Sequence, residues 1–151
     1  MSRVVVASAV IVFLAGFVSA QAPAPAKKER VDGFGGFFFR AKSPKTLAQW
    51  YSDHLGVTLT PTDYGGEPWQ QLAGPTVFEP FPADTKYFGS PDHAFMLNFR
   101  VKNLDAMVAQ LRGAGIAVNV DAKTYPNGRF AHLSDPEGNP IELWQPQRNA
   151  Q

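Results

Sequence analysis

The chain has 151 residues, which suits one domain with a sizeable core, and its 44% hydrophobic and 13% aromatic residues exclude disorder over most of its length. A formal net charge of +1, with no basic run longer than Lys27 and Lys28, excludes an extended nucleic-acid surface. The sequence contains no cysteine, so disulfides, thiolate metal sites and cysteine nucleophiles are excluded as well.

The N-terminus has the features of an export signal. Arg3 is followed by an almost uninterrupted apolar run over residues 4–18, and small residues precede Gln21. Residues 1–20 are therefore predicted to be a cleavable signal peptide, with an uncleaved anchor as the alternative. Residues 21–30 include the Pro- and Ala-rich letters QAPAPAKK, which predict an extended linker. We expect a periplasmic or secreted protein that has no membrane segment after cleavage.

The folded domain is predicted over residues 31–147, with a short tail at 148–151. In its first half, residues 31–80, Ser43 and Pro44 give a helix-start signal and Gly56 a stop signal. Apolar side chains recur at helical spacing between them. Four strands are expected around this helix, at residues 34–40, 57–60, 68–73 and 76–79.

The second half, residues 92–147, repeats this order. Asn103 is a good N-cap for a helix that ends at Gly113 to Gly115. Strands are expected at residues 93–101, 116–120, 129–134 and 140–144. The order strand, helix and three strands thus occurs twice, which predicts an α+β domain of two paired modules. The alternative is a generic α+β domain whose internal repeat is accidental.

Three stretches carry a resemblance to a known family. They are SPKTLAQWYSDHLGV at 43–57, FMLNFRVKNLDAMVAQLRGAGI at 95–116 and GRFAHLSDPEGNPIELWQP at 128–146. In order and spacing the chain resembles the vicinal oxygen chelate family, which includes glyoxalases and bleomycin-resistance proteins. The resemblance implies two paired βαβββ modules that form a curved sheet around a cavity, with helices on the convex side. It also implies a small-molecule ligand and a homodimer.

Alternation along the strands predicts which side chains line that cavity. Phe95, Leu97, Phe99 and Val101 form an apolar set that is expected to face the helices, as are Ile141 and Leu143. The alternate positions then point inward. The predicted substrate-binding residues are Phe38, Arg40, Trp69, Met96, Asn98, Arg100, Phe130 and Trp144.

The resemblance also implies positions for a divalent metal, and this sequence departs from them. Gly36, which has no side chain, stands at the position in the first strand, and Met96 supplies a soft thioether at the third. Glu142 alone matches. The usual metal centre is therefore expected to be absent, and no cofactor is expected. A displaced divalent-metal site built from Glu79, His132 and Glu142 is the alternative.

Glu142 and His132 are the predicted catalytic residues, because a carboxylate on a buried strand and an imidazole both suit acid-base work. In the alternative interpretation Glu142 is an inherited carboxylate paired with Arg40, Arg100 or Arg129. His132 is then a packed histidine. The segment 79–89, rich in Pro and aromatic residues, is predicted to be a packed linker or a lid.

Three functions are compatible with this pattern. The first is a secreted, metal-independent small-molecule binder. The second is a metal-dependent lyase, isomerase or dioxygenase of the glyoxalase type that uses Glu142 with non-standard ligands. The third is a ligand-free dimerisation module. Whether the chain is an enzyme stays open at this point.

Overall fold

The computed structural model describes residues 29–63 and 65–147. The chain divides into two units at Phe37 and Phe38, and every helix and strand belongs to the second. Described residues 29–37 form no regular secondary structure. The predicted signal peptide, most of the linker and the tail at 148–151 lie outside the described residues. Within the part that is described, no helix is long and apolar enough to cross a membrane.

Two helices form where their capping signals predict them. Helix α1 (Pro44–Leu55) starts with Pro44 in its first turn and ends at Gly56, whose φ of 70° is left-handed. Helix α2 (Leu104–Gly113) follows Asn103, whose side chain accepts a hydrogen bond from the Ala106 N–H. Both helix predictions are confirmed.

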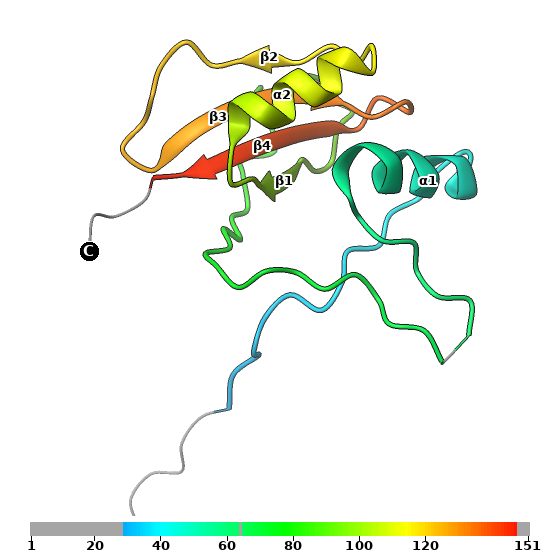
Figure 1. Ribbon diagram of the computed structural model, residues 1–151. Coiled ribbons are helices and arrows are strands. Elements are labelled where there is room, and N and C mark those ends of the chain that lie inside the picture. Colours follow the sequence, from blue (N-terminus) through cyan, green and yellow to red (C-terminus); the bar gives the residue numbers. More distant parts are fainter. Residues whose placement is uncertain (1–28, 64, 148–151) are drawn as a thin grey trace, which may run out of the picture. The chain divides into compact units, whose positions relative to one another are not determined.

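The second half of the domain forms a four-stranded mixed sheet (Figure 1). In space the strand order is β1-β4-β3-β2, with β1 parallel to β4 and the other neighbours antiparallel. The strands are β1 (Leu97–Arg100), β2 (Asn119–Val120), β3 (Gly128–Ser134) and β4 (Pro140–Pro146). The predicted strands of this half are therefore confirmed, although β1 and β2 are shorter than expected.

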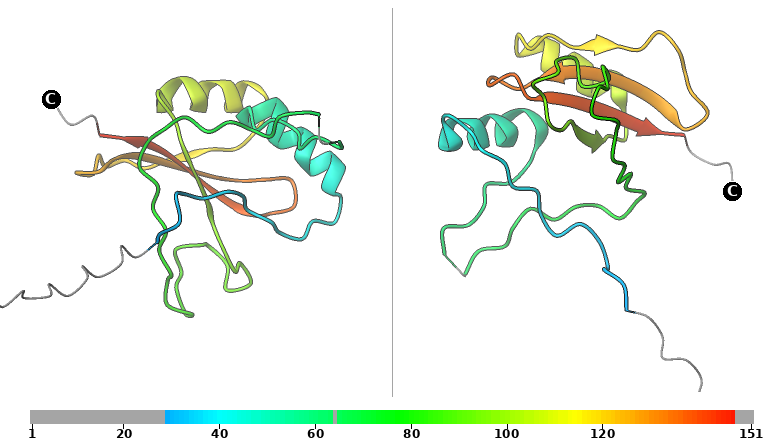
Figure 2. Two further views of the ribbon diagram at one scale, coloured as in Figure 1. Left: turned by 90° about the horizontal axis from the view of Figure 1, so that it is seen from below. Right: turned by 180° about the vertical axis from the view of Figure 1, so that it is seen from behind.

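Both helices pack on one side of this sheet (Figure 2). Leu47 and Tyr51 of α1 and Leu104, Val108 and Leu111 of α2 are buried in one cluster with strand side chains of alternate positions. The strand side chains in this core are Ala131 and Leu133 of β3 and Ile141 and Leu143 of β4. Each fully buried Leu or Ile contributes about 1.5–3 kcal/mol of hydrophobic free energy. The predicted alternation of faces is confirmed for β4, and β3 shows the same alternation.

The turn between β3 and β4 ties α1 to the sheet. Asp135 is 5% exposed and accepts hydrogen bonds from the backbone of Glu137 and Asn139, from the Asn139 amide and from the Tyr51 hydroxyl. Glu137 accepts the backbone N–H groups of Lys42 and Ser43, directly before α1. The DPEGN motif therefore fixes both the hairpin and the start of the first helix.

The first half differs from its prediction. In the described residues, the segments 34–40, 57–60, 68–73 and 76–79 form no strand, so those four strand predictions are wrong for this structure. Residues 57–80 include Pro61, Pro68, Pro75 and Pro80, each of which lacks the N–H that a sheet ladder needs. The α+β class is thus confirmed, with its sheet built by the second half alone.

Candidate functional site

Glu142 lies in the centre of the sheet, on the face opposite the helices. Its neighbours in register are Asn98 on β1 and His132 on β3. The side chain is almost completely buried, at 4% exposed, and a buried carboxylate is costly unless hydrogen bonds compensate it. The Asn98 amide donates to Oε1, and the hydroxyl of Tyr87 donates to Oε2 at 2.5 Å. These partners replace the arginines that the sequence suggested.

His132 lies between two carboxylates. Its Nε2 is 3.3 Å from Oδ1 of Asp121 and 3.8 Å from Oε2 of Glu142. His132 and Glu142 are paired in register on neighbouring strands, so their side chains face the same side of the sheet. Asp121 was missed by sequence reasoning. The available signal was its position two residues after Asn119, which pairs with His132 and so places Asp121 on the same face.

Tyr87 comes from the irregular segment 79–89 that joins the two halves. Its ring stacks on Phe81, with centroids 5.4 Å apart and planes 6° apart, and contacts the His132 ring edge-on at 6.1 Å. Burial, and then the hydrogen bond to Glu142, raise the pKa of the Tyr87 phenol well above its ordinary value. Tyr87 therefore stays a protonated donor to Glu142, and this hydrogen bond joins the segment 79–89 to the sheet.

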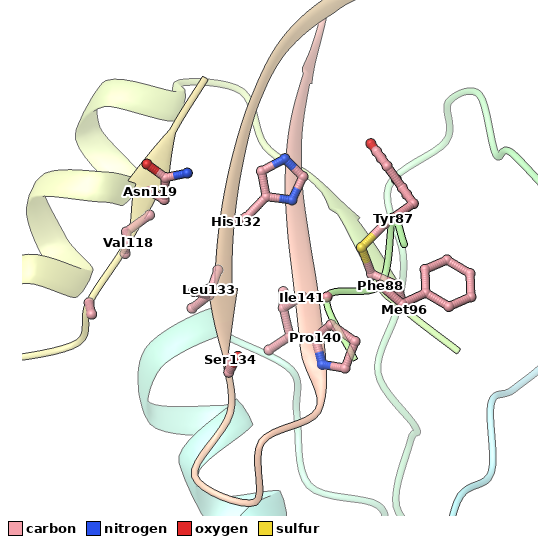
Figure 3. A pocket seen from close by; sticks show the side chains of 12 residues that line it. Tyr87, Phe88, Met96, Val118, Asn119, His132, Leu133, Ser134, Pro140 and Ile141 are labelled. Atoms are coloured by element: carbon pink, nitrogen blue, oxygen red, sulfur yellow. The ribbon is translucent and has the colours of Figure 1, made fainter. Parts of the chain in front are cut away.

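A pocket of about 600 Å³ opens beside these residues (Figure 3). Tyr87 and His132 stand at one end of it, and Ser134 and Pro140 stand at the other. Its other lining residues are Phe88, Gly89, Met96, Ala117, Val118, Asn119, Leu133 and Ile141. The lining is thus mainly apolar with a few polar groups, which is the usual composition of a small-molecule site.

The predicted substrate-binding residues are not all brought together. Met96 lines the pocket, and Asn98 lies behind it on Glu142. Arg100 donates to the carbonyl of Leu72, and Phe38 is 94% exposed. Arg40 is also exposed, and the Trp69 ring packs edge-on against Phe99. In the described part of the chain, the pocket lining does not include Phe38, Arg40, Trp69 or Arg100.

Phe130 and Trp144 form a separate aromatic pair on neighbouring strands. Their rings stack with centroids 6.2 Å apart and planes 3° apart. The Trp144 indole N–H donates to the carbonyl of Asn127, in the loop before β3. The pair therefore anchors that loop and lies outside the pocket lining.

The donor groups do not fit a metal centre. At the positions that the resemblance gives for metal ligands, Gly36 has no side chain and Met96 is a soft ligand. Among residues 29–63 and 65–147, no group of three His, Asp or Glu side chains is arranged to hold a metal ion. This includes the alternative set Glu79, His132 and Glu142.

The family of the chain is decided by a match of residues 36–144 to the glyoxalase-like domain model. The chain belongs to this family. No curated protein matches the chain significantly. Among solved structures, the chain is similar to TnmS3, an antibiotic binding protein from Streptomyces sp. CB03234, with 28% identity over 70% of this chain and 88% of that one, at a TM-score of 0.46.

Two further solved structures are similar to this glyoxalase-like chain. A glyoxalase/bleomycin resistance protein from Streptomyces sp. CB03234 is 40% identical over 38% of this chain and 50% of that one, with a TM-score of 0.31. A glyoxalase/bleomycin resistance protein/dioxygenase from Nocardioides is 21% identical over 72% and 79% of the two chains, with a TM-score of 0.40. The superpositions are loose, and the family assignment rests on the sequence match.

Proposed function

We propose that this glyoxalase-like chain is a secreted protein that binds a small molecule in the pocket beside His132, without the usual metal centre of the family. The observation that carries the proposal is the pocket itself. Its volume of about 600 Å³ lies in the range of small-molecule sites, and its lining combines Phe88, Met96 and Ile141 with a few polar groups. A pocket of this size takes a ligand with one or two rings.

Binding without a metal is supported by the residues that stand at the family's metal-ligand positions. Position 36 has no side chain, and Met96 offers only a thioether. Glu142 accepts hydrogen bonds from Tyr87 and Asn98, which compensate its buried charge without a cation. The residues near Glu142 are therefore better suited to holding the carboxylate than to presenting it to a cation.

A ligand screen tests the binding proposal. The melting temperature of the protein is measured with a panel of aromatic and aliphatic compounds that includes 2-naphthol. The pocket variant is Asn119→Trp, which places an indole at the lining on β2, and the matched control is Ala48→Trp at an exposed position of α1. We expect the melting temperature of wild type and control to rise with ligand, and that of Asn119→Trp to stay unchanged.

Two results would contradict the proposal. In one, no compound raises the melting temperature of the wild type. In the other, Asn119→Trp responds as strongly as the control. Elemental analysis of protein purified without chelators checks the metal independently. Stoichiometric metal would favour the alternative function, a metal-dependent lyase, isomerase or dioxygenase.

The proposal includes a homodimer, supported by exposed apolar side chains in the first half of the domain. Leu59, Leu72 and Val77 are 45%, 69% and 64% exposed, which is unusual for large apolar side chains so close in sequence. Sedimentation equilibrium is expected to give the mass of two chains. Leu72→Glu should shift the protein toward one chain, whereas the neighbouring Gln71→Glu should not. A wild-type protein that is monomeric at all concentrations would contradict this part.

Export is proposed from the N-terminal sequence. N-terminal sequencing of protein recovered from the periplasm or medium is expected to start at Gln21, after the small residues 18–20. Recovery of the chain with Met1 intact and membrane-bound would favour the uncleaved anchor instead.

A further inference from the structure

At the polar end of the pocket, the polar hydrogens of Tyr87 and His132 point toward neighbouring carboxylates. Tyr87 has one hydroxyl hydrogen, and it is donated to Oε2 of Glu142 at 2.5 Å. Burial and this hydrogen bond both raise the pKa of the phenol, so the hydrogen stays in place. A ligand that reaches Tyr87 therefore meets only the lone pairs of its oxygen.

The ring hydrogen of His132 is likewise directed at carboxylates. Carboxylates only accept hydrogen bonds, so the hydrogen of the imidazole lies on Nε2, which faces Asp121 at 3.3 Å and Glu142 at 3.8 Å. In the neutral ring Nδ1 then carries a lone pair. No hydrogen bond to Nδ1 is formed within the described part of the chain, and His132 lines the pocket. It is a second acceptor at the same end as Tyr87 (Figure 3).

The charged side chains that lie next to His132 at this end of the pocket are both acidic. Asp121 and Glu142 stand directly behind His132, whereas the pocket lining contains no Lys or Arg. The two nearby arginines of the sheet are engaged elsewhere, Arg100 with the Leu72 carbonyl and Arg129 with Asp105. A bound anion would therefore meet two carboxylates, with no Lys or Arg in the pocket lining to balance them. Asn119 and Ser134 can donate or accept, and they favour neither sign.

We infer that the pocket selects ligands that carry a hydrogen-bond donor, as a hydroxyl, phenol or ammonium group, on an apolar body, and that it rejects carboxylates. The donor meets the Tyr87 oxygen and His132 Nδ1, and the apolar body packs on Phe88 and Met96. Asp121 is a positioning residue, because its carboxylate decides which nitrogen of His132 faces the ligand. This inference rests on the proposed function and adds the class of ligand.

Three probes with one ring system test it by isothermal titration calorimetry. They are 2-naphthylmethylamine, a cation, neutral 2-naphthol and anionic 2-naphthoate, compared at about pH 8, where the three probes carry these charges. We expect the amine and the naphthol to bind, and the naphthoate to bind at least about tenfold more weakly than either. Because the rings are the same, the ratio of dissociation constants reports the polar end alone.

Asp121→Asn probes the positioning role with almost unchanged volume. We expect the preference for the amine over the naphthoate to fall by about fivefold, since one of the two charges behind His132 is removed. Asp53→Asn, at an exposed position of α1, makes the same change of net charge and should leave the preference unchanged. Far-UV circular dichroism confirms that both variants fold. A simple loss of pocket structure would weaken all three probes together and would leave their ratio intact.

The outcomes separate the two proposals. Binding of naphthoate as tightly as the amine would overturn the donor inference and leave the binding function standing. Equal shifts of the ratio in Asp121→Asn and Asp53→Asn would show a bulk-charge effect and would also overturn it. If none of the three probes binds, the binding proposal itself fails and this inference fails with it.

Discussion

The two halves of the domain have a similar order of sequence signals and reach different structures. Residues 92–147 form a strand, a helix and three more strands, with a continuous core between them. Residues 38–80 form α1 and, apart from the undescribed position 64, no other helix or strand. Helix α1 itself is held by the second half, through Asp135 and Glu137 of the β3–β4 turn.

The difference lies in how each strand finds its partner. The β3–β4 hairpin is local, its turn is fixed by hydrogen bonds to Asp135, and seven residue pairs are in register. In the first half, Pro61, Gly65, Gly66 and Pro75 lie between the expected strands and Pro68 begins one of them, and no short turn of the DPEGN kind pairs these strands. Hydrophobicity without a local partner does not build a strand.

The site follows the same division. His132, Asp121, Glu142 and Met96 all come from the second half. Tyr87, Phe88 and Gly89 of the lining come from the joining segment, and Tyr87 is held at the site by its hydrogen bond to Glu142. A binding function in this chain thus needs the second half to be rigid, whereas it tolerates a first half with little regular structure.

Truncation of core side chains gives the largest predicted contrast between the halves. Leu143→Ala removes a fully buried side chain of β4 and should lower the free energy of unfolding by about 2–5 kcal/mol. Leu72→Ala removes a side chain that is 69% exposed and should change it by less than about 0.5 kcal/mol. Urea denaturation at a concentration where the chain is monomeric measures both. Equal losses would mean that residues 57–80 pack as a core, against this account.

A smaller effect is predicted for the turn that links α1 to the sheet. Asp135→Ala leaves the backbone N–H groups of Glu137 and Asn139 and the Tyr51 hydroxyl without their acceptor, at a cost of about 3 kcal/mol. Tyr51→Phe removes one of these hydrogen bonds and should cost about 1 kcal/mol. Denaturation curves compare the two variants. If the Tyr51 variant lost as much as the Asp135 variant, the turn would not be the organising feature.

The smallest effect concerns Tyr87 and alkaline pH. The pKa of Tyr87 is raised in the folded state, so its contribution to stability is complete below the ordinary tyrosine pKa of about 10 and is lost as pH rises through the folded-state pKa. Tyr87→Phe should therefore flatten the fall of stability above about pH 10. Thermal melts of both proteins across this range measure the difference. Parallel curves would show that Tyr87 is not coupled to Glu142.

Much of the fold could be predicted because its signals are local. Pro44 and Gly56 bound α1, Asn103 caps α2, and alternation gives the buried face of β3 and β4. The same period-two pattern placed Glu142 and His132 on one face. What the pattern could not give is strand pairing in the first half, because pairing depends on a partner and not on the strand alone.

Two residues of the site, Tyr87 and Asp121, were not predicted from the sequence for a related reason. Tyr87 follows no periodic segment, so nothing in its neighbourhood indicates that its hydroxyl reaches Glu142, 55 positions away. Asp121 directly follows β2 and lies one residue beyond the strand predicted over residues 116–120. Arg100 and Arg129 have the charge to pair with a buried Glu142. Hydrogen bonds from the neutral side chains of Asn98 and Tyr87 compensate the burial of this carboxylate instead.

The central claim is that the ligand site lies beside His132 and is built by the second half and the joining segment 79–89. Titration of ¹⁵N-labelled protein with 2-naphthylmethylamine, followed by amide chemical shifts, tests it most directly. The account predicts that the perturbed amides are those of the pocket lining, such as Phe88, Asn119, His132 and Ser134, with residues 57–80 unchanged. Perturbations concentrated in residues 57–80, with the amides around His132 unmoved, would contradict it.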